Sequence, residues 1–306
     1  MTGVQTCALP IFTVDMANGI VVGDPTLTGT DTLRHVEGIR GSWLADTYNA
    51  TGFGSSSLNA GSSGTYNEFE GNGGDDTIIG NGNTRLSFYQ ARSGVTVNFT
   101  SNEGYVNGTY QGASGTATGD ASVGTDTFSG VSGANGSFFD DTFIGSNNPN
   151  GSSEWFRGNG GNDYIDGRGG LDGSDYHLAE VSGVAVNMAA GIVTGDFTTG
   201  ADTLRSIEMI QGSDFSDVYD ATGFGANSVN AGSNGTWNQF QPFDGDDTIF
   251  GNNNTQIGYW SSTSAVNVVF TSNNAGYADG AGSGQDRKST RLNSSHIPLS
   301  RMPSSA

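Results

Sequence analysis

The stretch Gly158–Asp175 reads GNGGNDYID followed by GRGGLDGSD, and it is the most informative part of the sequence about the fold. Glycine, glycine and aspartate recur at matching places nine residues apart, each time just ahead of a segment short enough for a small β-strand. Glycine adopts the left-handed backbone of a tight turn at little steric cost. A six-residue turn followed by a three-residue strand, when repeated, predicts a narrow parallel β-roll.

Similar short segments occur along the whole chain, between turns rich in Gly, Asn, Asp and Ser. Each has about four to six residues with β-branched or aromatic side chains, which is typical of strands. No stretch shows a sustained helical period. The sequence therefore predicts an all-β solenoid of short strands and Gly/Asp-rich turns. The clearest predicted strands are Asp76–Ile79, Arg85–Tyr89, Val95–Phe99, Asp141–Ile144, Asp163–Ile165, Val184–Met188, Asp247–Phe250 and Gln256–Trp260.

A longer repeat contains this short one. GVTVNF (Gly94–Phe99) returns as GVAVNM (Gly183–Met188) and, more loosely, as AVNVVF (Ala265–Phe270), while DTYNATGFG (Asp46–Gly54) returns as DVYDATGFG (Asp217–Gly225). Internal repeats of this kind indicate stacked structural units. Cutting before each VN-type strand gives units 13–95, 96–184 and 185–266, and a truncated fourth unit, 267–285.

The two ends of the chain have a different origin. Thr2–Ile11 (TGVQTCALPI) and Asp286–Ser295 (DRKSTRLNSS) can be encoded by one DNA segment translated in its two opposite directions, and that segment resembles a sequencing-library adapter. We therefore expect 1–11 and 286–306 to be adapter artefact. On this interpretation 12–285 is an internal piece of a longer protein, whose native termini and export signal are replaced.

The charge of the chain excludes several classes of protein. It has 306 residues with 31 acidic and 11 basic side chains, a formal net charge of -20, and a pI of about 4.1. Residues 12–285 contain seven Arg, no Lys and 30 acidic residues, a net charge of -23. A nucleic-acid partner needs a basic surface and is excluded. No apolar run approaches the ~18 residues of a membrane span, and one cysteine excludes a disulfide scaffold.

The repeated turns favour a hard cation. Ca²⁺ prefers about 6–8 oxygen ligands at about 2.3–2.6 Å; glycine-rich turns offer main-chain carbonyls, and each turn adds one aspartate. Stacking such turns crowds carboxylates, which repel one another until a cation lies between them. Metal binding then contributes to the free energy of folding, which would reconcile an ordered repeat with a composition poor in Leu, Ile, Val and Phe.

The tandem pair resembles the GGxGxDxUx nonapeptides of RTX, or haemolysin-type, calcium-binding proteins. Ser182–Asp196 and Gly200–Asp217 are similar to the segments that separate such nonapeptides in long secreted proteins of this family, and the resemblance covers most of 13–280. It implies a right-handed parallel β-roll or β-helix with Ca²⁺ between coils, and export through a type I secretion machinery. The expected function is a calcium-binding structural module that folds when it meets extracellular Ca²⁺. The module is expected to be secreted or on the cell surface, where an adhesin-like stalk is one version of this role.

Matched residue by residue, the metal-binding aspartate of the family falls on Asp163 and Asp172, which are expected to face a shared oxygen-lined pocket. It also falls on Asp76 and Asp247 in two similar turns, where the adjacent Asp75 and Asp246 are further candidates. In the last turn Pro242, Phe243 and Asp244 replace Gly-Asn-Gly; because Phe disfavours positive φ, that site requires Asp244 as a ligand. Carbonyl donors or positive-φ positions are expected at Gly158, Gly160, Gly161, Gly169 and Gly170. Ser174 takes an apolar place and is expected to weaken the core.

Other residues have two interpretations. Asp46, Asp141 and Asp217 recur once per unit without the preceding glycines, and they are interpreted either as metal ligands or as turn residues. Asp126 and Asp202 are expected to be strand-start or turn residues. The four Trp residues favour core or stacking roles, with a surface or polysaccharide ligand left open. No G-x-S-x-G or H-E-x-x-H motif occurs, so no catalytic site is predicted. The alternative is an extracellular carbohydrate-active β-helix enzyme or its binding domain.

Overall fold

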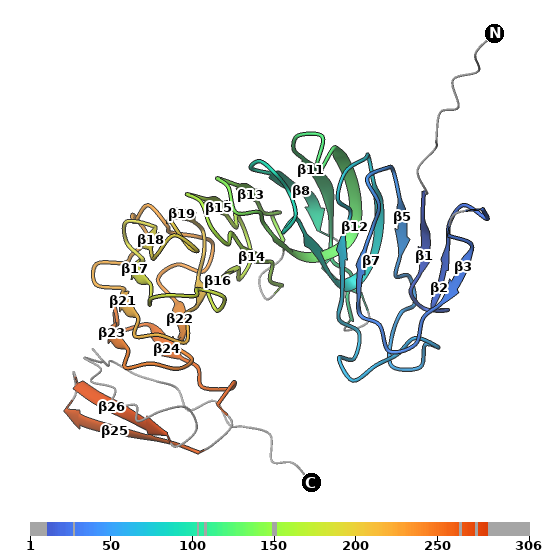
Figure 1. The fold of residues 1–306 in the computed structure, drawn as a ribbon. Helices are drawn as coiled ribbons and strands as arrows, with labels where there is room; N and C mark the ends of the chain where they lie inside the picture. The colour runs from blue at the N-terminus through green and yellow to red at the C-terminus, as the bar shows by residue number, and fades with distance from the viewer. Residues whose placement is uncertain are drawn as a thin grey trace.

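The computed structural model describes residues 11–26, 28–102, 104–106, 109–148, 152–262, 265–272 and 275–280. These residues form strands, turns and irregular connections, and none of them is helical (Figure 1). The predicted all-β class with many short strands is therefore confirmed. Among these residues, no helix that could cross a membrane was found. Apart from Ile11, the two ends assigned to adapter sequence lie outside the described residues, as do 281–285 of the fourth unit.

The strands pair into two rows, and the first row is the longer. Its parallel pairs are interrupted by short antiparallel segments. In spatial order it contains β3 (Thr30–Thr32), β2 (Ile20–Val22), β1 (Thr13–Asp15), β5 (Thr47–Asn49), β7 (Thr77–Ser87), β12 (Thr125–Asn135), β11 (Ala113–Thr118), β8 (Thr96–Asn102), β13 (Thr142–Ile144), β15 (Tyr164–Asp166), β19 (Ala201–Arg205), β18 (Ile192–Thr194), β17 (Ala185–Asn187), β21 (Val218–Asp220) and β23 (Thr248–Phe250).

The second row is parallel throughout. Strands β7 and β12 belong to both rows, because their first residues pair in the first row and their last residues in the second. The order of the second row is β4 (Gly38–Arg40), β6 (Asn67–Glu70), β7, β12, β14 (Trp155–Arg157), β16 (Gly173–Asp175), β20 (Met209–Gln211), β22 (Asn238–Gln241) and β24 (Thr255–Ile257).

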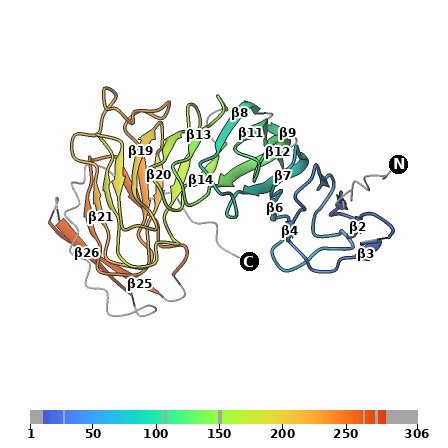
Figure 2. The same ribbon diagram turned by 45° about the horizontal axis from the view of Figure 1, so that its top comes forward.

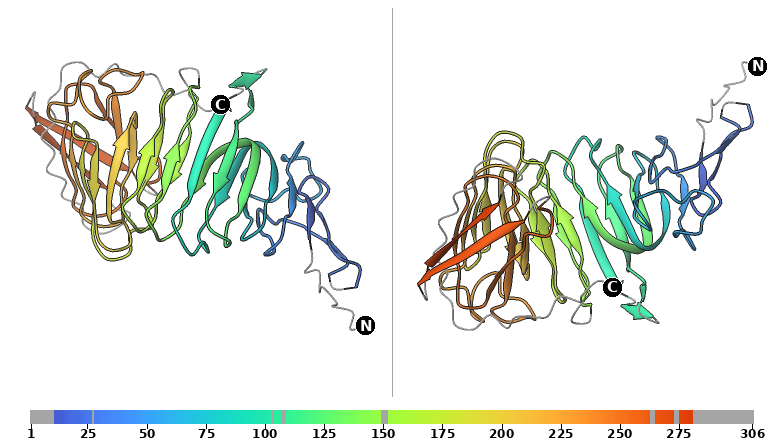
Figure 3. Two further views of the ribbon diagram at one scale, coloured as in Figure 1. Left: turned by 90° about the horizontal axis from the view of Figure 1, so that it is seen from above. Right: turned by 90° about the horizontal axis from the view of Figure 1, so that it is seen from below.

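The tandem pair supplies one strand to each row. Strand β15 pairs with β13 in the first row, and β16 pairs with β14 in the second. The chain thus crosses from one row to the other at each nine-residue step. Figures 2 and 3 show the strands side by side along the molecule, with the first strands (blue) at one end and the last (orange) at the other. The prediction of a largely parallel sheet of short strands is confirmed.

Each long unit begins with an antiparallel segment of the first row, which was not predicted. The segments are β1–β2–β3, β8–β11–β12 and β17–β18–β19. The unit boundaries at 13, 96 and 185 fall on the first residues of β1, β8 and β17. The fourth boundary, 267, falls one residue inside β25 (Val266–Ser272), which pairs antiparallel with β26 (Ala275–Gly280). A small hairpin of β9 (Tyr105–Val106) and β10 (Thr109–Tyr110) lies between β8 and β11.

The core lies between the two rows. In the first row Phe143, Ile165 and Leu204 share one register and are fully buried. In the second row Phe156 occupies the matching inward position. The rings of Phe143 and Phe156 are 5.6 Å apart, so a single core joins the rows.

Ser174 interrupts this core, as the sequence predicts. It pairs in register between Phe156 and Ile210, and its side chain is fully buried. Its Oγ has no hydrogen-bond partner among the described residues. A buried hydroxyl without a partner loses its hydration and gains nothing in return, at a cost of about 1–3 kcal/mol.

We predict that Ser174→Ala raises the free energy of unfolding by about 1 kcal/mol, because it removes the unpaired hydroxyl without adding volume. Urea unfolding at a fixed Ca²⁺ concentration measures the change. As a reference for core damage, Phe156→Ala should lower the free energy of unfolding by about 3–5 kcal/mol. A loss of stability in Ser174→Ala would contradict the assignment of Ser174 as a core defect.

Candidate metal centre

Buried aspartates mark the beginning of the first-row strands. Six of them directly precede a strand, and Asp126 and Asp202 are the second residues of β12 and β19. All eight are almost completely buried, namely Asp46, Asp76, Asp126, Asp141, Asp163, Asp202, Asp217 and Asp247. A buried carboxylate needs hydrogen bonds or a cation to offset its lost hydration.

Main-chain donors connect these carboxylates into what we call carboxylate ladders. The N–H of Asp141 donates to Oδ1 of Asp163 (2.8 Å), and the N–H of Asp163 donates to Oδ1 of Asp202 (2.9 Å). Each carboxylate therefore ties its own strand to the preceding strand of the row. The equivalent bonds in the other units join Asp46 to Asp76 (2.7 Å), Asp76 to Asp126 (2.9 Å) and Asp217 to Asp247 (2.9 Å).

The ladders bring acidic groups close together in a dry environment. Burial, together with the charges of Asp46 and Asp75, raises the pKa of Asp76 to about 7 against the opposing main-chain hydrogen bond. Burial likewise raises the pKa of Asp126 to about 8. Burial, followed by the charge of Asp202, holds the pKa of Asp163 well above its usual range. Near neutral pH, such groups accept either a proton or a metal ion.

Three of the turns satisfy their aspartate completely, and we call them serine turns. In Gly136–Asp141, the N–H of Ser137 donates to Oδ2 of Asp141 (2.6 Å), and its hydroxyl donates to Oδ1 (2.9 Å). The serine turns Gly41–Asp46 and Gly212–Asp217 have the same two bonds. No residue of these turns has a positive φ. Asp46, Asp141 and Asp217 are therefore turn residues with full sets of donors.

Four other turns have a different backbone, and we call them glycine turns: Gly71–Asp76, Gly158–Asp163, Gly167–Asp172 and Pro242–Asp247. Their second residues are left-handed, with φ of 62° at Asn72, 66° at Asn159, 59° at Arg168 and 53° at Phe243, and so are their fourth residues, Gly74, Gly161, Gly170 and Gly245. Among the described residues, the N–H groups of Asn72, Asn159 and Arg168 do not bond the carboxylates of Asp76, Asp163 and Asp172. Oδ2 of Asp76, Asp163 and Asp172 is buried without a hydrogen-bond partner among the described residues.

The first glycine of these turns is required by close approach. A Cβ on Gly158 would lie 1.7 Å from Oδ2 of Asp163, and one on Gly71 would lie 1.9 Å from Oδ2 of Asp76. On Gly167 it would lie 2.7 Å from Cβ of Asp172. In these three turns a side chain would displace the aspartate, whereas the fourth turn has Pro242 in this place.

Asp163 and Asp172 do not share a pocket, which corrects the sequence-based expectation. Asp172 precedes β16 of the second row, where the N–H of Glu154 donates to its Oδ1 (2.8 Å) and its own N–H donates to Glu208 (3.1 Å). Burial raises the pKa of Asp172 to about 9 and that of Glu208 to about 7. The physical reason is the nine-residue step, which places successive nonapeptides in different rows. Asp163 and Asp172 thus belong to two separate carboxylate ladders.

The predicted glycines have distinct environments. Gly161 and Gly170 are left-handed, with φ of 115° and 140°. Gly158, Gly160 and Gly169 are not; Gly160 packs near the carbonyl of Phe197, and the carbonyl of Gly169 accepts the N–H of Asn148 (2.9 Å).

The adjacent acidic candidates lie outside the ladders. Asp75 and Asp246 are exposed. Oδ1 of Asp75 accepts the N–H of Thr125 (2.9 Å), and the N–H of Asp246 donates to Ser216 (3.1 Å). Phe243 does adopt the left-handed backbone that its residue type disfavours, and its ring lies 4.4 Å from that of His177. The glycine-turn backbone thus persists at Asp247 despite the changed sequence.

Sequence reasoning missed four ladder members, which are Asp126, Asp202, Glu154 and Glu208. A signal for the first two was present, because Asp126-Thr127 and Asp202-Thr203 repeat the Asp-Thr pair of Asp76-Thr77 ahead of an apolar residue. No comparable signal marks the two glutamates.

Comparison of the chain with models of protein families and with curated proteins gave no match. Within the described residues, no three His, Cys, Asp or Glu side chains form a group that could hold a metal ion. A site built mainly from main-chain carbonyls with one or two carboxylates, which Ca²⁺ accepts, does not need such a group. The glycine turns provide the carboxylate oxygens for a site of this kind.

We predict that the metal-free chain becomes less stable as pH rises. The ordinary pKa of Asp is about 3.9, whereas Asp76 and Asp126 have folded-state pKa values of about 7 and about 8. Between these limits the folded state binds more protons than the unfolded state, so the free energy of unfolding falls with rising pH. In excess chelator, circular dichroism should therefore show less β-structure at pH 8.5 than at pH 5.5.

The substitution Asp126→Asn is the matched control, because it removes one raised carboxyl while keeping an acceptor for the N–H of Asp76. It should flatten the pH dependence. β-structure that increases with pH in the unsubstituted, metal-free chain would refute the prediction.

Proposed function

We propose that the chain is a calcium-binding structural module of the RTX type, from a large secreted protein, folded as a right-handed parallel β-roll or β-helix solenoid. The observation that supports it best is the contrast between the two kinds of turn. In serine turns both aspartate oxygens accept protein donors. In glycine turns Oδ2 of Asp76, Asp163 and Asp172 is buried without one.

The donor set suits Ca²⁺ better than a softer metal. The ladders contain carboxylates and main-chain groups, and neither His nor Cys hydrogen-bonds within them. Oxygen donors favour hard cations, and Ca²⁺ tolerates the irregular geometry that turns provide. Asp76, Asp163, Asp172 and Asp247 would hold the ion with carbonyls of the glycine turns. A bound cation offsets the repulsion that raises the pKa values of the ladders.

A structural role follows from where these carboxylates lie. Each one ties neighbouring strands of a row together, so cation binding would stabilise the stacking itself rather than a separate pocket. Extracellular calcium modules bind with Kd of about 10⁻⁴–10⁻³ M, which leaves them empty in the cytosol and filled outside the cell. The module would then pass a type I secretion machinery unfolded and order itself after export.

We predict that Ca²⁺ induces folding of the full chain. Circular dichroism should show little β-structure in excess chelator and a cooperative gain as Ca²⁺ reaches about 10⁻³ M. Mg²⁺ at the same concentration serves as the control and should give a much smaller gain, because it requires a stricter octahedral geometry. Equal β-content with and without Ca²⁺ would refute the coupling of metal binding to folding.

We also predict that the two kinds of turn respond differently to substitution. Asp163→Asn should raise the Ca²⁺ concentration at the folding midpoint by about tenfold, which corresponds to ~1.4 kcal/mol. The matched control is Asp141→Asn in a serine turn. This substitution should lower the free energy of unfolding to a similar extent under two conditions: in acid, where the carboxyls are protonated, and at saturating Ca²⁺. If both substitutions shift the Ca²⁺ midpoint equally, the glycine turns are not the binding sites.

A further inference from the structure

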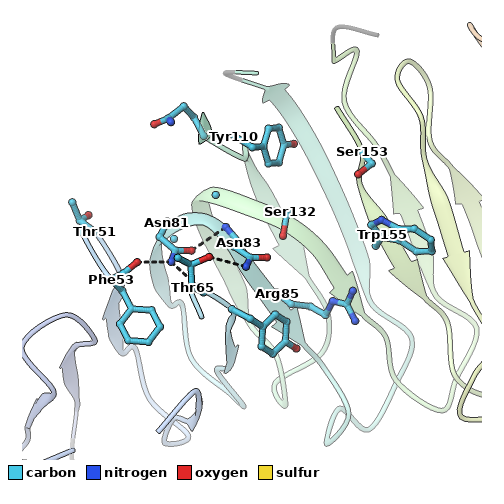
Figure 4. Close-up of a pocket in the computed structure, with 15 residues that line it drawn as sticks. Thr51, Phe53, Thr65, Asn81, Asn83, Arg85, Tyr110, Ser132, Ser153 and Trp155 are labelled. Atoms are coloured by element: carbon cyan, nitrogen blue, oxygen red, sulfur yellow. Dashed lines mark hydrogen bonds between the residues drawn. The ribbon is translucent and has the colours of Figure 1, made fainter. Parts of the chain in front are cut away.

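A cavity of about 780 Å³ lies where β7 and β12 bend from the first row into the second. Figure 4 shows side chains around it from several strands, with Tyr110, Trp155, Arg85 and Asn83 placed around an open space. Its lining contains aromatic, amide and hydroxyl groups. None of these groups belongs to the carboxylate ladders.

The residues of one wall of the cavity are held in place by hydrogen bonds to one another. The amide of Asn81 donates to the carbonyls of Phe53 (3.0 Å) and Thr65 (2.8 Å), and the amide of Asn83 donates to the hydroxyl of Thr65 (3.0 Å). The third unit repeats this network with Asn252, Asn254, Phe224 and Thr236. A network present in both units holds the turns in place and does not by itself indicate a ligand.

The opposite wall is specific to this place in the molecule. Trp155 and Arg85 lie on either side of Gly133 in the register of the second row. Because adjacent strands are ~4.8 Å apart, Arg85 and Trp155 are separated by ~10 Å with no side chain between them. The third unit has Gln256 in the position of Arg85. On its other side Trp155 pairs with Gly173, and its indole packs over that glycine.

The charge of the lining is unusual for this chain. The protein has 31 acidic residues, yet none lines the cavity, where Arg85 is the charged residue. Among the described residues, Arg85 forms no salt bridge. Glu68 lies close by, since it accepts the hydroxyl of the lining residue Tyr66 (2.9 Å). Together with the net charge of -20, this carboxylate disfavours a polyanionic ligand.

We propose that this cavity binds a neutral oligosaccharide, with one sugar ring stacked on the indole of Trp155 that lines it. Sugar rings present apolar C–H faces to aromatic planes and hydroxyls to amides, hydroxyls and guanidinium groups. Arg85 and Ser153 line the cavity with donors for those hydroxyls, and the hydroxyl of Ser132, which donates to the carbonyl of Thr84 (3.3 Å), offers an acceptor. Concave sites that combine apolar surface with a few converging polar groups are typical of small-molecule recognition. The site is independent of the proposed cation sites.

Isothermal titration calorimetry of the full chain at saturating Ca²⁺ tests this proposal with cellohexaose, xylohexaose, mannohexaose and hexagalacturonate. At least one neutral hexasaccharide should bind saturably, and Trp155→Ala should weaken that binding at least tenfold. Arg85→Gln should also weaken it, while keeping the fold, because glutamine occupies this position in the third unit. The matched controls Gln256→Glu and Trp260→Ala, the latter at a largely exposed ring, should leave the affinity unchanged.

Three results would overturn the proposal. The first is the absence of saturable binding of any neutral probe to a chain that circular dichroism shows to be folded. The second is binding of hexagalacturonate alone, which would make the ligand anionic. The third is binding that survives both Trp155→Ala and Arg85→Gln, which would place the sugar elsewhere. Since all titrations are made on Ca²⁺-folded protein, failure here leaves the calcium proposal untouched.

Discussion

The structure depends on the hydrogen bond between a buried aspartate and the main-chain N–H at the start of the neighbouring strand. From the second unit into the third, these bonds run from Asp141 through Asp163 to Asp202. A three-residue strand offers few main-chain hydrogen bonds of its own, so the carboxylate fixes where each strand begins. The same bond that aligns the strands also places negative charges side by side in a dry interior. The hydrogen bond that aligns the strands is therefore also the reason that the carboxylates repel one another.

The turns resolve that repulsion in two chemical ways. A serine after the first glycine supplies both an N–H and a hydroxyl, as Ser137 does for Asp141. A left-handed residue in the same place, such as Asn159, supplies neither and leaves Oδ2 of Asp163 without a donor. In the first row, Asp141 of a serine turn is followed by Asp163 of a glycine turn, so one carboxylate has a full set of donors and the next has an oxygen without one. This difference of a single residue separates a structural turn from a candidate metal site.

The six-residue motifs made part of this arrangement predictable. Glycine at the first place and aspartate at the sixth follow from the close approach of Gly158 to the carboxylate of Asp163, so the turn class is visible in the sequence. The partners of the aspartates are not. Asp163 bonds Asp202, 39 residues away, because an antiparallel segment lies between them in the chain. Asp172 faces Glu154 and Glu208, because one nonapeptide moves the chain to the other row. Local spacing predicts a turn, whereas row and register depend on pairing across the whole unit.

The antiparallel segments that open each unit also set the shape of the molecule. They add strands to the first row alone, which has 15 members against nine in the second. Two rows that share a core and have unequal numbers of strands must bend, with the shorter row on the inside. Figure 1 shows this arc, with β13 and β15 along its outer side and β14 and β16 along its inner side. Curvature is thus determined by how often a hairpin is inserted, and a change in that frequency would straighten or tighten the arc without altering a single turn.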